Sequence, residues 1–203
     1  MKIIFDFDYT LFHTARFLDA LCQKFSPYSI NKDAFYGGLR GAYDKKHIFR
    51  PSHFLRTLAK DSHNQYNLLA EEFNSFCCSI DRYLYPDVVP FLRTLQKKHE
   101  FFLLTFGDKL FQNMKITGSG IIPYITRIII TENVTKDKEA YTISGVEPTI
   151  FVDDNPLALM AVKRYAPHII TVRMKREEGE HRDKSSGKEV DYEITSLTQL
   201  QTF

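Results

Sequence analysis

The sequence contains little cysteine, which argues against a domain stabilised by disulfides or by a structural zinc ion. Cys22, Cys77 and Cys78 are the only three in 203 residues, and no Cys-x-x-Cys pair is present. This pattern disfavours both a disulfide framework and a structural zinc site. An odd number of cysteines, two of them adjacent, fits a reducing compartment, so we expect a cytoplasmic protein.

Long apolar runs and a strong net charge are also missing. The longest apolar runs, such as residues 101–104 and 128–130, are far shorter than the roughly 20 residues that span a membrane as a helix. Near the N-terminus, Asp6 interrupts any signal-peptide core. The formal net charge is +2 with basic residues spread along the chain, so we expect neither a nucleic-acid nor a membrane partner.

The sequence does contain a series of short apolar segments that are typical of buried parallel strands. They occupy residues 3–5, 101–104, 128–130, 150–152 and 169–172. Their unalternating Ile, Val and Phe residues are expected of strands that are covered on both faces. Helical patterns lie between the strands, for example at 87–99 and at 155–165. This alternation predicts an α/β fold in which helices cover both faces of a mainly parallel sheet.

Residues 13–82 follow a different pattern, with helical stripes and no β-type run. Phe17, Leu21 and Phe25 form one such stripe. We therefore predict a helical insert at 13–82, directly after the first strand. Near the other end of the chain, residues 175–189 are nearly all charged or small, which predicts a solvated loop or hairpin tip.

Three of the predicted strands end in residues that can carry chemistry. The first strand ends at Asp6, with Asp8 two residues later, the second ends at Thr105, and the fourth ends at Asp153 and Asp154. Ligands bind outside the carboxyl ends of the strands in open parallel sheets, so we predict that these side chains surround one cleft. Clustered carboxylates repel one another, and a divalent cation relieves that repulsion. Oxygen ligands without His or Cys favour Mg²⁺ over zinc.

A magnesium site of this kind implies a small-molecule phosphate ester as the substrate, because bound Mg²⁺ usually keeps waters and a phosphate oxygen as ligands. One carboxylate can attack phosphorus to form an aspartyl-phosphate. A second acid two residues away can protonate the leaving alcohol and later activate water. Thr105 supplies a hydroxyl, and Lys136 or Lys138 supplies positive charge for the phosphoryl oxygens.

These segments resemble the motifs of the haloacid dehalogenase-like (HAD) hydrolase superfamily. FDFDYTL is similar to the first motif, a strand followed by DxDx[TV], and LLTFG is similar to the second. TKDKEAY resembles the third motif and IFVDDNP the fourth, in the order of the family. The resemblance implies a Rossmann-like three-layer core domain made of residues 1–12 and 83–203. It also implies that 13–82 is a helical cap domain of the C1 type.

The resemblance also implies a role for each motif residue. Asp6 would be the nucleophile and a Mg²⁺ ligand, and Asp8 would be the general acid and base, with its carbonyl on the metal. Asp153 and Asp154 would complete the metal site. The residues implied to contact phosphate are Thr105, Phe106, Gly107 and one lysine, either Lys138 or Lys136. We prefer Lys138, because a predicted helix begins directly after it.

The acid at position 8 narrows the expected reaction. An acid two residues after the nucleophile is similar to the pattern of the phosphatases and phosphomutases of the superfamily. Members that cleave carbon–halogen bonds lack this acid. We therefore expect a Mg²⁺-dependent phosphatase that hydrolyses a small phosphorylated metabolite through an aspartyl-phosphate. A phosphomutase of the same fold and a catalytically silent binding protein are the alternatives. Tyr9 stands where the family frequently has glycine, and we interpret it as a candidate specificity feature.

Overall fold

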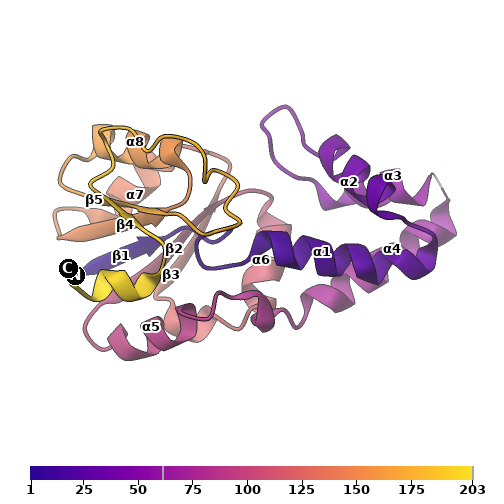
Figure 1. The fold of residues 1–203 in the computed structure, drawn as a ribbon, viewed down its shortest axis with the longest axis horizontal. Helices are drawn as coiled ribbons and strands as arrows, with labels where there is room; N and C mark the ends of the chain where they lie inside the picture. The colour runs from indigo at the N-terminus through magenta and orange to yellow at the C-terminus, as the bar shows by residue number, and fades with distance from the viewer. Residues whose placement is uncertain (61, 203) are drawn as a thin grey trace.

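The computed structural model describes residues 1–60 and 62–202, which form a sheet-containing part and a helical part (Figure 1). The sheet has six parallel strands in the order β3-β2-β1-β4-β5-β6. The strands are β1 (Lys2–Phe5), β2 (Glu100–Phe106), β3 (Arg127–Thr131), β4 (Thr149–Asp153), β5 (Ile170–Met174) and β6 (Tyr192–Ile194). The predicted parallel sheet is therefore confirmed.

The strands are apolar along their length because both faces of the sheet are buried. Ile3 and Phe5 of β1 belong to one apolar cluster, and Ile4 between them belongs to a second cluster on the opposite face. All three side chains are buried. Neither face of the central strand meets water, which is why its sequence shows no alternation of apolar and polar residues.

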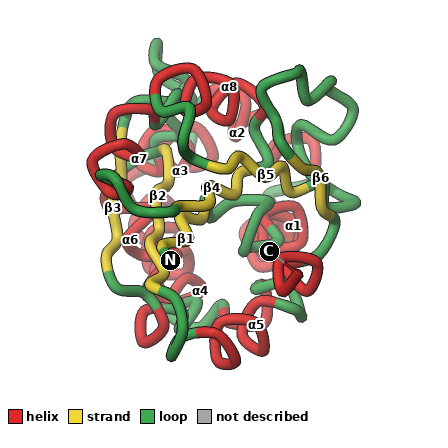
Figure 2. Tube along the Cα trace, turned by 90° about the vertical axis from the view of Figure 1, so that its left-hand side faces the viewer, coloured by secondary structure: helices red, strands yellow, loops and turns green. Residues whose placement is uncertain are grey.

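Two layers of helices cover the sheet, as Figure 2 shows. On one face lie α7 (Asp137–Ser144) and α8 (Pro156–Tyr165), whose apolar residues complete the smaller cluster. On the other face lie α5 (Val88–Leu95), α6 (Lys109–Gly118) and the 3-10 helix η4 (Leu197–Thr202). A further 3-10 turn, η3 (Ile122–Tyr124), leads into β3. The three-layer α/β architecture expected from the sequence is confirmed.

The chain between β1 and α5 forms a helical lobe, which comprises the described residues from 14 to 83. Its elements are α1 (Thr14–Phe25), η1 (Ser26–Tyr28), α2 (Lys32–Gly41), α3 (Pro51–Ala59), α4 (His63–Cys77) and η2 (Asp81–Tyr83). The lobe lies beyond the carboxyl ends of the strands (Figure 1). Phe25, Phe35 and Phe54 pack together in its interior, with ring centroids 5.2 to 6.2 Å apart. Its role as a cap stays a prediction.

Aromatic packing continues from the helical lobe into the sheet-containing part. Phe17 of α1 lies 5.4 Å from both Phe12 and Phe76, and 6.4 Å from Phe111 of α6, measured between ring centroids. All of these rings are buried and belong to the larger apolar cluster. One continuous apolar core therefore joins the helical lobe to the face of the sheet that α6 covers.

The backbones of α4 and α6 approach each other closely at Gly118. A β-carbon at this position would lie only 1.9 Å from the carbonyl oxygen of Cys77. The carbonyl of Gly118 accepts a hydrogen bond of 2.9 Å from the amide of Ile80. The end of α6 is thus joined to the helical lobe through main-chain contact, which only glycine permits at this spacing.

The charged segment after β5 is a loop, and a buried arginine of β5 donates hydrogen bonds to it. Arg173 is fully buried, and its guanidinium donates to the carbonyls of His181 and Lys184 and to the hydroxyl of Ser186. The contact with Lys184 measures 2.7 Å. Many side chains of the loop are exposed, as predicted, but the backbone from 181 to 186 is anchored to the sheet.

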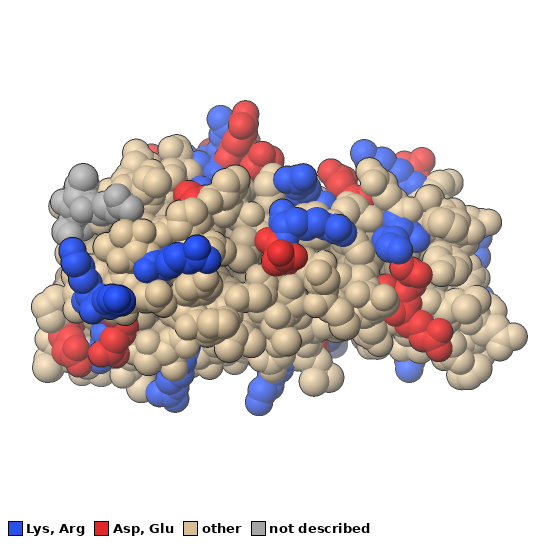
Figure 3. All heavy atoms as spheres, turned by 90° about the horizontal axis from the view of Figure 1, so that it is seen from below, with Lys and Arg blue, Asp and Glu red and all other residues tan. Residues whose placement is uncertain are grey.

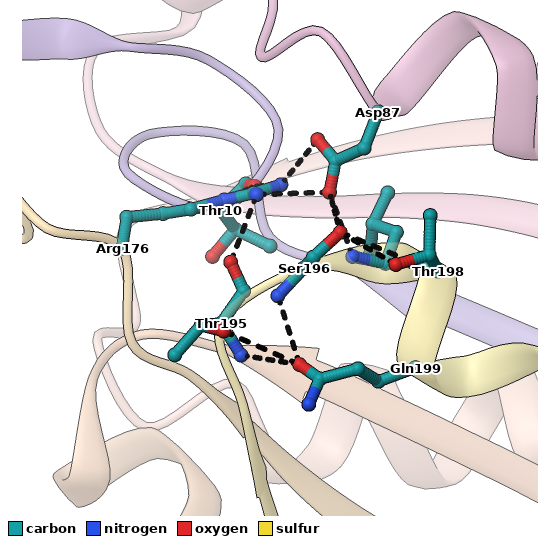
Figure 4. A network of polar contacts seen from close by, with 8 residues as sticks. Thr10, Asp87, Arg176, Thr195, Ser196, Thr198 and Gln199 are labelled. Carbon is teal, nitrogen blue, oxygen red and sulfur yellow. Dashed lines mark hydrogen bonds and ion pairs between the residues drawn. The ribbon is translucent and has the colours of Figure 1, made fainter.

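A second arginine, Arg176, joins the start of this loop to three other segments (Figure 4). Its guanidinium contacts both carboxylate oxygens of Asp87, at 2.9 and 3.0 Å. It also donates to the carbonyl of Thr10, at 3.1 and 3.2 Å, and to that of Thr195, at 3.1 Å. The Asp87 carboxylate in turn accepts from Ser196. The planar guanidinium, with five donors in a fixed fork, bonds both oxygens of one carboxylate side by side and still donates to two carbonyls.

Charged side chains of both signs are scattered over the face seen from below (Figure 3), with no continuous patch of one sign among the residues drawn in colour. This distribution agrees with the small net charge of +2. Within the described part of the chain, every helix is too short or too polar to cross a lipid bilayer.

Replacing Arg176 by methionine is expected to lower the free energy of unfolding by about 1.5–3 kcal/mol, because it removes the charged hydrogen bonds to the half-buried carboxylate of Asp87. Urea unfolding monitored by circular dichroism measures the change. Arg182→Met in the exposed part of the same loop is the matched control, with an expected change within about 0.5 kcal/mol. Equal changes in both variants would show that the ion pair of Arg176 with Asp87 is not what stabilises this junction.

Candidate active site

The register of the sheet places Asp6 beside Asp153. Phe5 of β1 pairs with Val152 of β4, and both acids follow these residues by one position. The amide of Asp6 donates to the carbonyl of Val152 at 2.9 Å, so the pairing extends to the end of the strand. Two acids that are 147 positions apart in the chain thus become neighbours at the carboxyl edge of the sheet.

Asp154, the next residue, joins these two acids to form a buried triad of carboxylates. One carboxylate oxygen from each of Asp6, Asp153 and Asp154 lies within 4.8 Å of the others. The side chains are nearly inaccessible, with exposed fractions of 5, 0 and 7%. The sequence predicted that these strand ends would meet, and the structure brings all three acids together.

Lys136 supplies the positive charge at this triad. Its ammonium group forms ion pairs with Asp6 and with Asp153, the latter at 2.8 Å. Lys136 immediately precedes α7 and has a left-handed backbone with a φ of 56°. Thr135 and Asp137 on either side bond to each other at 2.5 Å, and Asn133 bonds to both. This tight turn directs the lysine side chain toward the strand ends.

The preference for Lys138 over Lys136 is corrected by this geometry. Lys138 is exposed, whereas Lys136 has an exposed fraction of 3%. We expected the contact from the residue nearest the start of a helix, and α7 begins at Asp137, before Lys138. Lys138 lies within the helix and its side chain faces solvent. The left-handed turn that positions Lys136 is not visible as a pattern in the sequence.

The triad holds more negative charge than its surroundings neutralise. The pKa of Asp6 is raised to about 7, chiefly by burial; Lys136 lowers it, and the charges of Asp153 and Asp8 raise it. Burial also raises the pKa of Asp154, as do the charges of Asp153 and Asp6. Although burial lowers the pKa of Lys136, the adjacent carboxylates raise it by more. One ammonium group thus faces three carboxylates, and two negative charges stay unbalanced when all are ionised.

The residues present at the triad fit a bound divalent cation. The Oδ2 atom of Asp154 is buried and has no hydrogen-bond partner among the described residues. Carboxylate oxygens are the donors that hard cations such as Mg²⁺ bind, and two positive charges match the unbalanced charge. A cation held by Asp6, Asp153 and Asp154 would therefore satisfy both the orphaned oxygen and the electrostatic excess.

The carboxylate of Asp8 lies in a separate network formed by α6 and α1. Lys115 contacts its two oxygens at 2.6 and 2.7 Å, Gln112 donates to it at 2.9 Å, and Thr14 donates at 2.7 Å. Burial raises the pKa of Asp8, but the charge and hydrogen bond of Lys115, with those from Gln112 and Thr14, lower it to below its ordinary value. Asp8 is therefore held in its charged form.

Sequence reasoning missed Lys115 and Gln112. Lys115 is buried, and its ammonium lies 4.7 Å from the centre of the Phe111 ring. The available signal was their spacing of three residues on a helix that directly follows the second motif, which places both side chains on the same face. Nothing in the sequence indicated that this face points at Asp8 rather than at solvent.

Thr105 and the two residues that follow it lie at the same edge of the sheet. Thr105 is the penultimate residue of β2 and is buried. The amide of Gly107 donates to the carbonyl of Thr131 at 3.0 Å, and the carbonyl of Phe106 accepts from Gln112 at 2.8 Å. The Gly107 amide therefore continues the pairing of β2 with β3, and the phosphate contacts of Thr105, Phe106 and Gly107 stay predictions.

The helical lobe reaches this edge of the sheet through residues 42–50. Arg50 forms ion pairs with Asp108 at 2.7 Å and with Glu132 at 3.2 Å, and Lys46 pairs with Glu132 at 2.8 Å. Asp108 follows β2 and Glu132 follows β3. Arg50 also pairs with Asp44 at 2.9 Å within its own loop. Ion pairs thus join the lobe to the residues that follow β2 and β3.

A double-mutant cycle with Asp8→Asn and Lys115→Met is expected to give a coupling of roughly 0.5–3 kcal/mol in the free energy of unfolding at pH 7. The pKa of Asp8 is lowered from 3.8 in the folded protein. Its stabilising contribution is therefore present above pH 3.8 and is lost as the pH falls through the folded value. Denaturant unfolding across this range measures the coupling. A coupling that persists unchanged at lower pH would exclude an ion pair as its origin.

No protein-family model matches the sequence, and no curated protein matches it. Solved structures do match, over nearly the full length of both chains. A haloacid dehalogenase-like hydrolase from Burkholderia xenovorans is similar with a TM-score of 0.81 and 18% identity, covering 99% of this chain and 97% of that one. The magnesium-bound HAD-hydrolase YfnB from Bacillus subtilis has a TM-score of 0.65 and 18% identity, covering 99% and 96%.

An L-2-haloacid dehalogenase from Xanthobacter autotrophicus, with chloropropionic acid covalently bound, is also similar. Its TM-score is 0.60 and its identity is 17%, covering 99% of this chain and 96% of that one. At such identities the likeness shows a shared fold and leaves the reaction to be argued from the site. The chain therefore has the fold of the haloacid dehalogenase-like hydrolases, as its motifs predicted.

Proposed function

We propose that this protein is a Mg²⁺-dependent phosphatase that hydrolyses a small phosphorylated metabolite. The supporting observation is the buried triad of Asp6, Asp153 and Asp154 against Lys136, with Asp8 two residues from the nucleophile. These groups supply a nucleophile, positive charge for the phosphoryl oxygens and a carrier for the proton. Phosphoryl transfer needs all three.

Asp6, Asp153 and Asp154 would hold the Mg²⁺ ion. When bound, this ion would offset negative charge on the carboxylates and on the phosphoryl oxygens. Lys136 would stabilise the same phosphoryl charge from the position that its two ion pairs fix. Because its ammonium is buried and held from two sides, little reorganisation is needed during the reaction.

In the first step a carboxylate oxygen of Asp6 attacks phosphorus, and the bond from phosphorus to the leaving oxygen breaks. The product is an aspartyl-phosphate, with the bonding electron pair carried away by the alcohol oxygen. Only the ionised carboxylate of Asp6 attacks. Its pKa of about 7 without a cation would fall when positive charge is added beside it, so the cation also favours the reactive form.

Asp8 would move the proton in both steps. It gives a proton to the leaving alcohol and later takes one from the water that hydrolyses the aspartyl-phosphate. Lys115 favours the charged form of Asp8, which suits the second step. The first step needs a protonated Asp8 and is opposed by the same contact. Esters with a weakly basic leaving oxygen avoid this conflict, because they depart without a proton.

Three other functions are alternatives to the phosphatase. A phosphomutase would use the same residues but would pass the phosphoryl group to a second hydroxyl of the substrate. A silent binding protein would take up Mg²⁺ without turnover. Because haloacid dehalogenases share this fold, carbon–halogen cleavage is a third. The acid at position 8 favours the phosphate ester, because the superfamily members that cleave carbon–halogen bonds lack it.

The proposed location is the cytoplasm. Cys22, Cys77 and Cys78 are all free thiols in the structure. Cys77 is buried, and burial raises the pKa of its thiol to about 12, which keeps it protonated and unreactive. Free thiols of this kind are typical of proteins from a reducing compartment.

Magnesium is expected to raise the unfolding midpoint, by an amount that corresponds to about 2.7 kcal/mol at a hundredfold excess over its dissociation constant. Asp154→Asn should abolish this response. It should also stabilise the metal-free protein at pH 7, because a carboxyl with a raised pKa destabilises the folded state above pH 3.8. Thermal unfolding with and without Mg²⁺ measures both effects.

Asp183→Asn, at an exposed position in the charged loop, is the matched control for this experiment. It should keep the full response to Mg²⁺. Loss of the response in both variants, or in neither, would contradict the assignment of the metal to the triad.

Asp6→Asn is expected to abolish the release of phosphate from nitrophenyl phosphate in the presence of Mg²⁺, while the circular dichroism spectrum stays that of the native protein. The amide cannot form the aspartyl-phosphate. A panel of phosphate esters and chloropropionate, assayed with the unmodified protein, separates the alternatives. An isomerised product would indicate a mutase, chloride release a dehalogenase, and Mg²⁺ binding without turnover a silent protein. Full activity of Asp6→Asn would rule out the mechanism.

A further inference from the structure

Lys136 has a backbone conformation that residues with a side chain rarely adopt. Its φ is 56°, a left-handed value that glycine reaches without strain. A glycine would supply no ammonium group at this position. Within the described part of the chain, the Lys136 ammonium is the one cation that forms ion pairs with the triad. A strained backbone persists only where its surroundings hold it, so the residues around Lys136 have to supply that support.

Three side chains form a hydrogen-bonded triangle around this residue. The Thr135 hydroxyl lies 2.7 Å from the side-chain oxygen of Asn133 and 2.5 Å from a carboxylate oxygen of Asp137. The side-chain amide of Asn133 closes the triangle by donating to the same Asp137 oxygen at 3.3 Å. The main chain of the turn is bonded to Asn133 as well, because its side-chain oxygen accepts from the amide of Thr135 at 3.2 Å and its carbonyl from that of Lys136 at 3.3 Å. The residues on both sides of Lys136 are thus tied to each other and to Asn133.

The exposure of the segment alternates in step with this triangle. Its three side chains are half-buried, whereas those of Val134 and Lys138 are exposed. The side chain between them, that of Lys136, has an exposed fraction of only 3%. The polar groups of the triangle are therefore partly withdrawn from water, which strengthens the hydrogen bonds that they form with one another.

Thr131 at the end of β3 anchors the triangle to the sheet. Its hydroxyl donates to the carboxylate of Glu139 in α7 at 2.6 Å and accepts from the amide of Asn133 at 3.0 Å. Its carbonyl accepts from the amide of Gly107, the residue that follows β2, at 3.0 Å. The turn is therefore fixed to β3 at one end and to α7 at the other.

The lysine side chain cannot define the position of its charge by itself. It has a flexible stem of four carbons, and its ammonium lacks the fixed fork of a guanidinium. The place of the ammonium, 2.8 Å from Asp153, therefore depends on where the backbone of Lys136 is held. A shift of about 1 Å in a group that acts on the transition state can reduce a rate by roughly a hundredfold. A small displacement of this turn would thus change the reaction as well as the fold.

We propose that Asn133, Thr135 and Asp137 are positioning residues for the reaction. They act through Lys136, which they hold in its left-handed conformation with the ammonium against the triad. Their own side chains take no part in binding the phosphate ester or the metal ion. This inference rests on the proposed function, because it assumes that Lys136 stabilises the charge of the phosphoryl oxygens.

Two substitutions of Asp137 separate positioning from a contribution to the fold. Both Asp137→Ala and Asp137→Asn remove an acid from the first turn of α7, where it interacts favourably with the helix dipole. Only Asp137→Asn keeps an oxygen that accepts from Thr135 and Asn133. For nitrophenyl phosphate with Mg²⁺, kcat should fall by roughly tenfold to a hundredfold in Asp137→Ala and stay within about threefold in Asp137→Asn. KM should stay within about threefold in both, because a misplaced ammonium affects the transition state more than the bound ester.

Thr135 offers a second pair of variants at a residue without charge. Thr135→Ser keeps the hydroxyl and should keep kcat, whereas Thr135→Val removes the hydroxyl and should reduce kcat by a factor similar to that of Asp137→Ala. Asp33→Ala is the matched control, because it removes an exposed acid from the first turn of α2, and it should leave kcat unchanged. Lower melting temperatures at an unchanged kcat in Asp137→Ala and Thr135→Val would show that the triangle serves the fold alone, and would overturn its positioning role.

Crystal structures of the two Asp137 variants test the inference without any turnover. The ammonium of Lys136 should leave hydrogen-bond distance of Asp153 in Asp137→Ala, and the contact of 2.8 Å should persist in Asp137→Asn. An unchanged ion pair in Asp137→Ala would overturn the positioning role even if the protein is a phosphatase. A displaced ammonium, combined with no hydrolysis of any phosphate ester by the unmodified protein, would support the hold of the triangle on Lys136 and overturn the phosphatase.

Discussion

Negative charge that is buried at the end of a parallel sheet is the constraint on which the rest of the structure depends. The register between β1 and β4 brings Asp6 beside Asp153. Asp154 is the next residue in the chain and completes the triad. Carboxylates in such a place repel each other strongly, because little water is present to screen them. Lys136 offsets part of this charge. The remaining negative charge is what makes the site suited to a divalent cation.

Buried cations also organise the irregular parts of the chain. Arg173 and Arg176 hold a loop with little apolar content against the sheet, and Lys115 holds the carboxylate of Asp8. Each of these cations pairs with carboxylates or backbone carbonyls rather than with solvent. The loops around the site are thus fixed by directed polar contacts, which can set the position of a side chain more narrowly than apolar packing does.

Strands, layers and the acids at the strand ends could be predicted, because they follow from local patterns. A buried strand is apolar along its length, and an acid that ends it is visible one residue later. The choice between Lys136 and Lys138 could not be predicted, since it depends on a left-handed turn at Lys136. The partner of Asp8 could not be predicted either, because Lys115 is 107 positions away. Contacts over such distances depend on the packing of α6, which no local pattern encodes.

Gly118 shows how the helical lobe and the sheet-containing part constrain each other. At this position the main chain of α6 meets the main chain of the helical lobe, and a single methyl group would collide with the Cys77 carbonyl. Side chains can adjust their rotamers to a new neighbour, but a peptide carbonyl moves only with its helix. Any side chain there would push the ends of α4 and α6 apart. The alignment of the lobe over the strand ends is thus sensitive to a residue that contributes no chemistry at all.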